Sequence, residues 1–319
     1  MRNRNPNCSI FNPKGKTMST KTNTSQTTED TIQGLCELQR KRISILKSRI
    51  MIENRTISTV ATFLGFATSM EEEERKARFD EARKIIELVN KEKELKDLDQ
   101  RQSDFIKSLV GSSYQAVDGF QLGLELLEKD IVKSAKLLPI ADWVQETDQR
   151  GFGLKSFGII IGETGNISNY PNPAKLWSRM GCAPYQSKGE TLAGATWKSR
   201  TGNRDKNVHK LSTKEWEDYG YSPRRRSVMY VIGECLLKLN KGSYRKRYLE
   251  SKKIVMEKNL NNPDWKMNDC EKCAGEGCDK CLQFGKKCAR AHNHGMLLMS
   301  KLLLKNLWIE WTNAVGLRC

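Results

Sequence analysis

The distribution of proline constrains the fold of this chain more than any other feature of its sequence. None of the 8 prolines lies between residues 14 and 138. Because proline inside a helix removes a backbone hydrogen bond and clashes with the preceding turn, a span this long without it can form long helices. Residues 71–110 are dense in Glu, Lys, Arg and Leu, with apolar residues at helical spacing from Phe79 to Val89. This pattern predicts one long exposed helix or a short coiled coil, since the apolar stripe breaks at Lys93.

The N-terminal half is therefore expected to be helical beyond a short tail. Residues 1–30 are rich in Asn, Ser, Thr and Lys and are predicted to form a flexible tail. Residues 31–138 form the predicted helical region, in which a coiled coil is one alternative. Its last helix is expected over residues 115–138, where Pro139 follows its end.

The C-terminal half, residues 139–319, is predicted to be a second domain. Its texture changes to short segments punctuated by glycine, with further helices expected over residues 224–241 and 294–311. No run of alternating strands and no internal repeat is present in the sequence. The predicted fold class is mostly α: a C-terminal domain with a helix-hairpin-helix and a small zinc-knuckle insertion, preceded by a long helical segment.

The positive charge of the chain indicates a polyanionic partner. Lys and Arg number 55 against 38 Asp and Glu, a net charge of +17, and residues 195–260 hold 17 basic and 7 acidic residues, a net +10. DNA or RNA is the expected partner, an acidic membrane surface is a distant second, and a charge that only aids solubility is the alternative. No stretch approaches the ~18 apolar residues of a membrane span, and residues 1–28 contain no apolar signal segment. We therefore expect a cytoplasmic protein that does not interact with membranes.

A glycine pair suggests one way to bind a phosphate backbone. Gly151 and Gly153 bracket Phe152, with apolar helical patterns on both sides, which is typical of a helix-hairpin-helix. Glycine lets backbone amides approach a phosphate closely, and the N-terminus of the next helix, which carries Lys155, adds its dipole. Such a contact positions a duplex without reading its sequence. An ordinary turn between two helices is the alternative.

The residues that follow this hairpin resemble the C-terminal domain of the insertion-sequence-110/116/902 type transposases. The family pattern is a Gly-apolar-Gly hairpin, a Gly-Asp-Ile-like turn, a Phe/Tyr-Pro segment, Gly-Leu-Ala-Pro and a Gln-Ser-Gly-like element, followed by an Arg-rich helix. The resemblance covers roughly residues 105–312. The matching positions are residues 151–153, 165–167, 170–171, 175–176, 181–184, 186–187, 222–240 and 244–248, and Trp308 in the closing helix.

The resemblance implies a DNA recombinase that moves an insertion element, in some members guided by a structured RNA. In the family, a serine in the element that matches Ser187 is the nucleophile. A phosphoserine link would conserve the energy of the broken bond, and nearby positive charge would stabilise the transition state. The candidate DNA contacts are Gly151, Gly153, Lys155, Lys188, Lys198, Arg200, Arg224, Arg225, Arg226, Arg245 and Arg247.

The N-terminal half departs from the family. Family members carry a ribonuclease-H-like N-terminal domain with an Asp-Glu-Asp-Asp metal site, and no segment of residues 1–110 resembles it. The acidic run at residues 71–74 is interleaved downstream with Lys and Arg and is typical of a solvated helix face. Either another subunit supplies the acidic site, in which case Mg²⁺ is expected there, or the chain has kept DNA binding and lost transposition.

A cysteine cluster predicts a structural zinc site. Cys270 and Cys273 form one knuckle, and Cys278 and Cys281 form a second. Each knuckle directs two thiolates to one tetrahedral zinc, and four Cys ligands leave no open position for catalysis. The two knuckles are only four residues apart, so Cys288 and His292 are alternative ligands within the predicted insertion, residues 268–294. Free cytosolic thiols without metal are the other alternative.

Two functions therefore remain open from the sequence. The first is a transposase-like DNA recombinase with Ser187 as nucleophile, and the second is a non-catalytic, zinc-containing DNA- or RNA-binding protein derived from such an element. Acidic residues gathered near Ser187 would favour the first, and extended N-terminal helices away from the hairpin would favour the second. Guide RNA and a homo-oligomer are further candidate partners.

Overall fold

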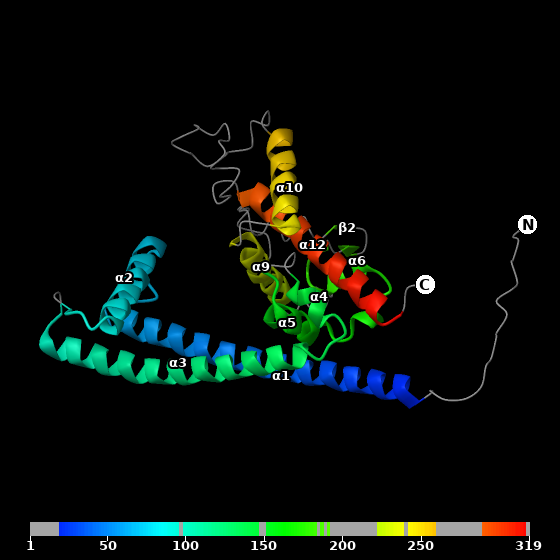
Figure 1. Ribbon diagram of the computed structural model, residues 1–319. Helices are drawn as coiled ribbons and strands as arrows, with labels where there is room; N and C mark the ends of the chain where they lie inside the picture. Colours follow the sequence, from blue (N-terminus) through cyan, green and yellow to red (C-terminus); the bar gives the residue numbers. More distant parts are fainter. Residues whose placement is uncertain are drawn as a thin grey trace, which may run out of the picture.

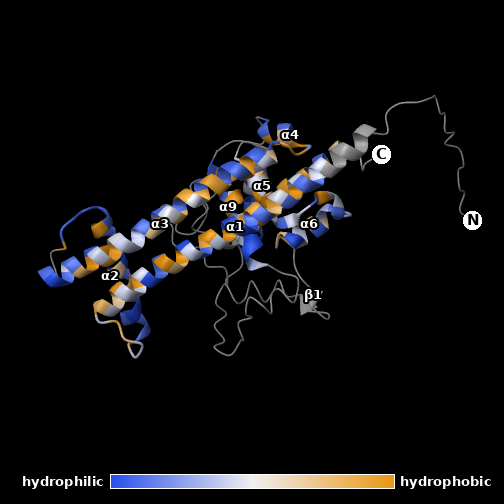
Figure 2. Ribbon diagram, turned by 90° about the horizontal axis from the view of Figure 1, so that it is seen from below, coloured by the Kyte–Doolittle hydropathy of each residue, from blue (hydrophilic) through white to orange (hydrophobic). Residues whose placement is uncertain are grey.

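A long antiparallel helical hairpin projects from a smaller helical domain (Figure 1). The computed structural model describes residues 19–95, 98–146, 151–183, 186–187, 190–191, 222–238, 242–259 and 289–316. Helix α1, Ser19–Phe63, and helix α3, Gln100–Ala135, form the hairpin, with α2, Glu72–Asn90, at its tip. Hydrophobic and hydrophilic residues alternate along both long helices (Figure 2), as expected for helices that bury one stripe.

The N-terminal half is helical as predicted, but its helix boundaries differ from the prediction. Helix α1 already begins at Ser19, inside the predicted tail. The single helix predicted over residues 71–110 ends at Asn90, and α3 then runs without a break through the predicted start of the next helix. Asp99 explains the restart, because its carboxylate accepts from the Gln102 amide at 2.8 Å while the Gln102 side chain accepts from the Asp99 amide. This capping box satisfies free amides at the start of α3 and begins a new helix.

A second, smaller core closes the tip of the hairpin. Val60 of α1, Ile86 of α2 and Val110 of α3 are buried there. The rings of Phe63 and Phe105 stack with centroids 5.0 Å apart. Since a helix of this length is stabilised mainly by packing of its apolar face, this core holds the far end of the hairpin together.

The smaller domain is built from short helices around one long closing helix. Its helices are α4, Ala141–Gln145; α5, Leu154–Thr164; the 3-10 turn η2, Ile167–Asn169; α6, Pro173–Arg179; α9, Pro223–Lys238; α10, Ser243–Asn259; and α12, Ala289–Ala314. Two-residue strands β1, Gln186–Ser187, and β2, Glu190–Thr191, pair antiparallel, with Ser187 opposite Glu190. The predicted mostly helical class is confirmed, and α9 and α12 lie where helices were predicted.

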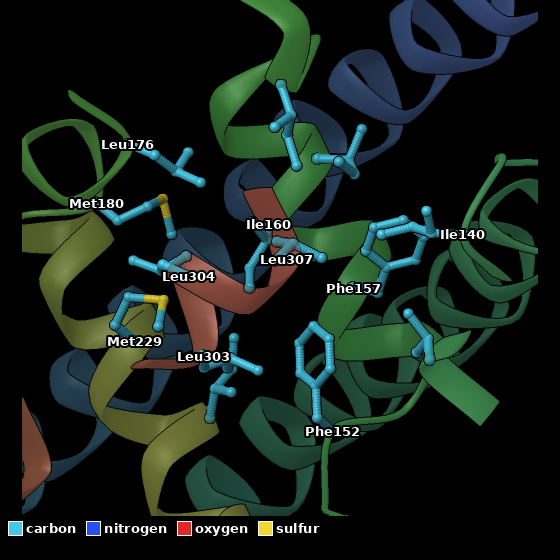
Figure 3. Packing of buried hydrophobic residues seen from close by; sticks show 14 of the residues in the cluster. Ile140, Phe152, Phe157, Ile160, Leu176, Met180, Met229, Leu303, Leu304 and Leu307 are labelled. Carbon is cyan, nitrogen blue, oxygen red and sulfur yellow. The ribbon is translucent and has the colours of Figure 1, made fainter. Parts of the chain in front are cut away.

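Helix α5 lies at the centre of the main core (Figure 3). Its Phe157 and Ile160 are fully buried and contribute to the same apolar cluster as Leu307 of α12. Leu35 of α1 and Ile131 of α3 belong to this cluster as well. The predicted domain boundary between residues 138 and 139 therefore falls within one shared core. None of the described helices is long and apolar enough to cross a membrane.

Candidate nucleic-acid interface

The carboxylate of Glu163 is the buried polar centre of the smaller domain. Its side chain is 2% exposed and lies near the end of α5, after the apolar run Phe157–Ile161. Arg224 donates to both carboxylate oxygens, with an Nη2–Oε2 distance of 2.6 Å, and Arg225 Nε lies 3.3 Å from Oε2. Gln39 of α1 donates from Nε2 to Oε1 at 2.8 Å. One carboxylate thus joins α1, α5 and the start of α9.

The pKa of Glu163 reports how well this carboxylate is compensated. Burial alone raises the pKa of a carboxyl group, because it disfavours the charged form. Here the hydrogen bonds from Arg224 and Gln39 and the charges of Arg224 and Arg225 outweigh burial and lower the pKa of Glu163. The ionised form is therefore the one that the fold stabilises.

Glycine allows α1 to approach α5 closely enough for this contact. A Cβ at Gly162 would lie 2.6 Å from the Cβ of Gln39 and 2.9 Å from the carbonyl oxygen of Leu35. A Cβ at Gly158, one turn earlier, would lie 2.5 Å from Cγ2 of Ile131 on α3. These two glycines bring α5 against both long helices, so that Gln39 reaches Glu163.

Arg226, the last residue of the arginine triplet 224–226, contacts the chain on the other side of the segment 184–221. Arg226 donates from Nη1 to the carbonyl oxygen of Gly181 at 2.9 Å. Gly181 has a φ of +69°, and a Cβ there would lie 3.4 Å from the carbonyl oxygen of Ser222. Gly181 and Ser222, which flank the segment 184–221, therefore lie close together. Ser187 belongs to this segment, in the short strand β1.

Three tryptophans fix the turn η2 and the helix α6, which precede Gly181. Trp308 donates to the carbonyl oxygen of Tyr170 at 2.7 Å, and Trp311 donates to Ser168 Oγ at 3.0 Å. Trp177 of α6 donates to the carbonyl oxygen of Lys301 at 2.9 Å. Segments separated by more than 100 residues are thus bound together by α12.

Two exposed arginines that the sequence did not single out lie next to residues that form this site. Arg40 follows Gln39 on α1, and Arg179 ends α6, two residues before Gly181. Burial raises the pKa of the Cys36 thiol, and the charges of both arginines oppose that rise. Burial also lowers the pKa of Arg225, and the charge of Arg179 lowers it further. We refer to Arg40, Arg179, Arg224 and Arg225 as the arginine cluster.

The glycine hairpin lies at the opposite end of α5 from this cluster. Gly151 has a φ of +91°, Gly153 caps the N-terminus of α5, and Phe152 is 1% exposed. Because α5 rises about 1.5 Å per residue, Gly153 and Glu163 are separated by about 15 Å along the axis. Lys155 forms an ion pair with Glu128 at 3.0 Å, and Glu128 also forms an ion pair with Arg42. The hairpin glycines and the arginine triplet are therefore separate surfaces.

The remaining basic residues proposed from the sequence lie elsewhere. Arg245 donates from Nη1 to the carbonyl oxygen of Leu237 at 2.8 Å, at the far end of α9 from Arg224. Arg247 is exposed on α10. Lys188, Lys198 and Arg200 lie outside the described residues.

The proposed zinc site falls largely outside the described residues. Cys270, Cys273, Cys278, Cys281 and Cys288 all lie there. His292 is described, in the first turns of α12. The Tyr248 hydroxyl lies 2.8 Å from its Nδ1 and the Tyr230 hydroxyl 3.2 Å from its Nε2, so the ring joins α9, α10 and α12. Within the described ranges, no group of three or more His, Cys, Asp or Glu residues could hold a metal ion.

The sequence missed Glu163 and its partner Gln39. The available signal was the position of Glu163 in an apolar helix, because a charge on a buried face needs a partner. Its partners, Gln39 and Arg224, lie 124 and 61 residues away in the chain, and no local pattern identifies them.

Comparison of the chain with protein-family models, curated proteins and solved structures finds no match. Function is therefore inferred from the residues themselves.

Proposed function

We propose that this chain is a DNA-binding recombinase of the insertion-sequence-110 type that cleaves and rejoins strands through Ser187. One observation carries the proposal. The residues that flank the segment bearing Ser187, Gly181 and Ser222, lie together beside Arg226, which donates to the carbonyl oxygen of Gly181. A nucleophile for phosphodiesters needs positive charge nearby, because the transition state accumulates negative charge on the phosphate oxygens.

The proposed strand cleavage needs no external energy source. The Ser187 hydroxyl loses its proton to water, its oxygen forms a bond to phosphorus, and the bond between phosphorus and the leaving strand oxygen breaks. That oxygen takes up a proton and becomes a strand hydroxyl. The phosphoserine diester keeps the bond energy, so a hydroxyl of another strand can attack it and release Ser187.

Among the described residues near the arginine cluster, no set of carboxylates fits the acidic metal site of the family. The buried carboxylate there is Glu163, and both of its oxygens accept from arginine. A carboxylate engaged in this way is a poor ligand for Mg²⁺, which prefers several free oxygen ligands and water. No step is therefore assigned to a metal held by Glu163.

Substitution of Ser187 tests the recombinase proposal. We expect Ser187→Ala to abolish a covalent protein–DNA adduct and to leave DNA affinity nearly unchanged, because only the attacking oxygen is lost. The adduct is detected as a denaturant-resistant shift of the protein with supercoiled or branched DNA. Ser58→Ala, on the helical hairpin, is the matched control and should form the adduct normally. If the wild-type protein forms no adduct on either substrate, the proposal is wrong.

A non-catalytic DNA-binding protein is the second candidate function. It is favoured by the long helices α1, α2 and α3, which occupy the part of the chain where the family has its nuclease-like domain. In this alternative, the chain would bind DNA or RNA with an affinity that falls steeply with salt. Strong binding without any adduct would support it.

We also propose that Cys270, Cys273, Cys278 and Cys281 hold one structural zinc ion. The purified protein should contain about one zinc per chain by mass spectrometry, as expected for a closed Cys₄ site. Cys278→Ser should lose this zinc, whereas Cys235→Ser, an exposed cysteine outside the cluster, should retain it. Loss of zinc from His292→Gln with retention in Cys278→Ser would instead identify the alternative ligand set.

A further inference from the structure

The positive charge of the arginine cluster is only partly compensated by acidic residues. Arg224 and Arg225 of α9 bind the buried carboxylate of Glu163. Arg40 follows Gln39, which donates to the same carboxylate, and Arg179 ends α6 two residues before Gly181, which accepts from Arg226. Among the described residues, Glu29 of α1 is a further acid, and it accepts from Asn166, just after α5, at 2.8 Å. Four positive charges face two negative charges, so the site carries a net positive charge.

The contacts of Glu163 divide the cluster into an inner and an outer part. Arg224 and Arg225 direct hydrogen-bond donors inward to the carboxylate. Arg40 and Arg179 are exposed. The guanidinium group carries five donors, so the inner arginines also retain donors for a second acceptor. Arginine matches the geometry of a phosphate group with two parallel hydrogen bonds.

We propose that the arginine cluster binds a phosphodiester of duplex DNA, with Arg40 and Arg179 as direct contacts and Glu163 as the positioning residue for Arg224 and Arg225. This inference rests on the proposed DNA-binding function and adds to it a defined site. Gly181 and Ser222, which flank the segment bearing Ser187, lie together beside Arg226, the residue that follows Arg225.

The direct contacts are tested by the salt dependence of binding to a fluorescein-labelled DNA duplex. Each phosphate contact contributes about 0.9 to the slope of log affinity against log salt. We expect Arg40→Gln combined with Arg179→Gln to reduce the slope by roughly 2 and to weaken binding. Both residues are exposed, so the double variant should remain folded.

Two arginines on the helical hairpin provide the matched control. Arg55 and Arg101 are also exposed, and Arg55 lies about 22 Å along α1 from Arg40. Arg55→Gln combined with Arg101→Gln makes the same change in net charge and should leave the slope unchanged. An equal loss of slope in both double variants would show an unspecific charge effect and would overturn the site.

The outcomes separate this inference from the proposed function. If the wild-type protein binds the duplex and the Arg40/Arg179 variant retains its slope, the site is wrong while the Ser187 proposal stands. If the wild-type protein binds no DNA, both are wrong. A loss of slope with an RNA duplex but not with the DNA duplex would overturn DNA as the ligand.

The positioning role of Glu163 has a readout of its own. Glu163→Gln removes a negative charge beside the bound phosphate, so charge alone would strengthen DNA binding. We expect weaker binding instead, because the glutamine no longer fixes Arg224 and Arg225. Glu163→Asp should rescue part of the affinity, since it retains the carboxylate. Tighter binding by Glu163→Gln would overturn the positioning role.

Discussion

Replacing both Arg224 and Arg225 by alanine is expected to lower the free energy of unfolding by about 3–5 kcal/mol. Removing one side of a buried ion pair leaves the other charge without compensation, and Glu163 is only 2% exposed. Removing the Glu163 carboxylate while keeping both arginines is expected to lower the free energy of unfolding by less. The side chains of Arg224 and Arg225 are 38% and 20% exposed, so they can turn toward water when Glu163 is absent. Urea-induced unfolding at neutral pH measures the difference.

A third substitution distinguishes an unpaired charge from lost packing. Adding Glu163→Gln to the double arginine variant removes the buried charge and should recover most of the lost stability, because Gln39 still faces the new amide. Arg55→Ala is the control for removing an exposed arginine and should change little. A triple variant less stable than the double variant would contradict the assignment of Glu163 as a compensated buried charge.

The loss of stability in the double arginine variant should become smaller as the pH falls. In the wild-type protein the pKa of Glu163 lies below its ordinary value of 4.5. Its contribution is therefore present above about pH 4.5 and lost as the pH falls through the lowered pKa. Without the two arginines, burial raises the pKa of Glu163, so acidification to about pH 4.5 should relieve the unpaired charge. The stability difference between the two proteins should therefore shrink on acidification.

The arginines of the triplet are poor probes of DNA binding, because they also stabilise the fold. The sequence offers Arg224, Arg225 and Arg226 as surface contacts, yet the first two bind Glu163 and the third binds Gly181. Their substitution alters folding and DNA binding together. Arg40 and Arg179 separate the two effects, because both side chains are exposed.

The sequence predicts the helical architecture well and the candidate site only in part. A proline-free span and a local apolar period suffice to predict long helices, because both act within a few turns of the chain. The break after Asn90 depends on the Asp99 capping box, which is a local signal in the sequence. The site around Glu163 is different, since its partners Gln39 of α1 and Arg224 of α9 lie 124 and 61 residues away in the chain, and tertiary packing of this kind leaves no short-range pattern.

The close approach of α1 to α5 leads to the second large expected effect. Gly162→Ala is expected to lower the free energy of unfolding by about 1–3 kcal/mol, the usual cost of overpacking a core. The new Cβ would lie 2.9 Å from the carbonyl oxygen of Leu35, and a backbone atom inside α1 cannot move aside as a side-chain end can. Alanine favours a helix by about 1 kcal/mol over glycine, so the loss must exceed this gain.

Gly158 and Gly119 make this prediction specific to the contact. Gly158→Ala should cost less than Gly162→Ala, because its nearest neighbour, at 2.5 Å, is a side-chain methyl of Ile131. Gly119, on α3, has no atom within 4 Å of an added Cβ, so Gly119→Ala should stabilise the protein by about 1 kcal/mol through helix propensity alone. Thermal and urea unfolding of the three variants measure these effects. Stabilisation by Gly162→Ala would mean that α1 and α5 do not pack closely, and the Gln39–Glu163 hydrogen bond would then lose its structural basis.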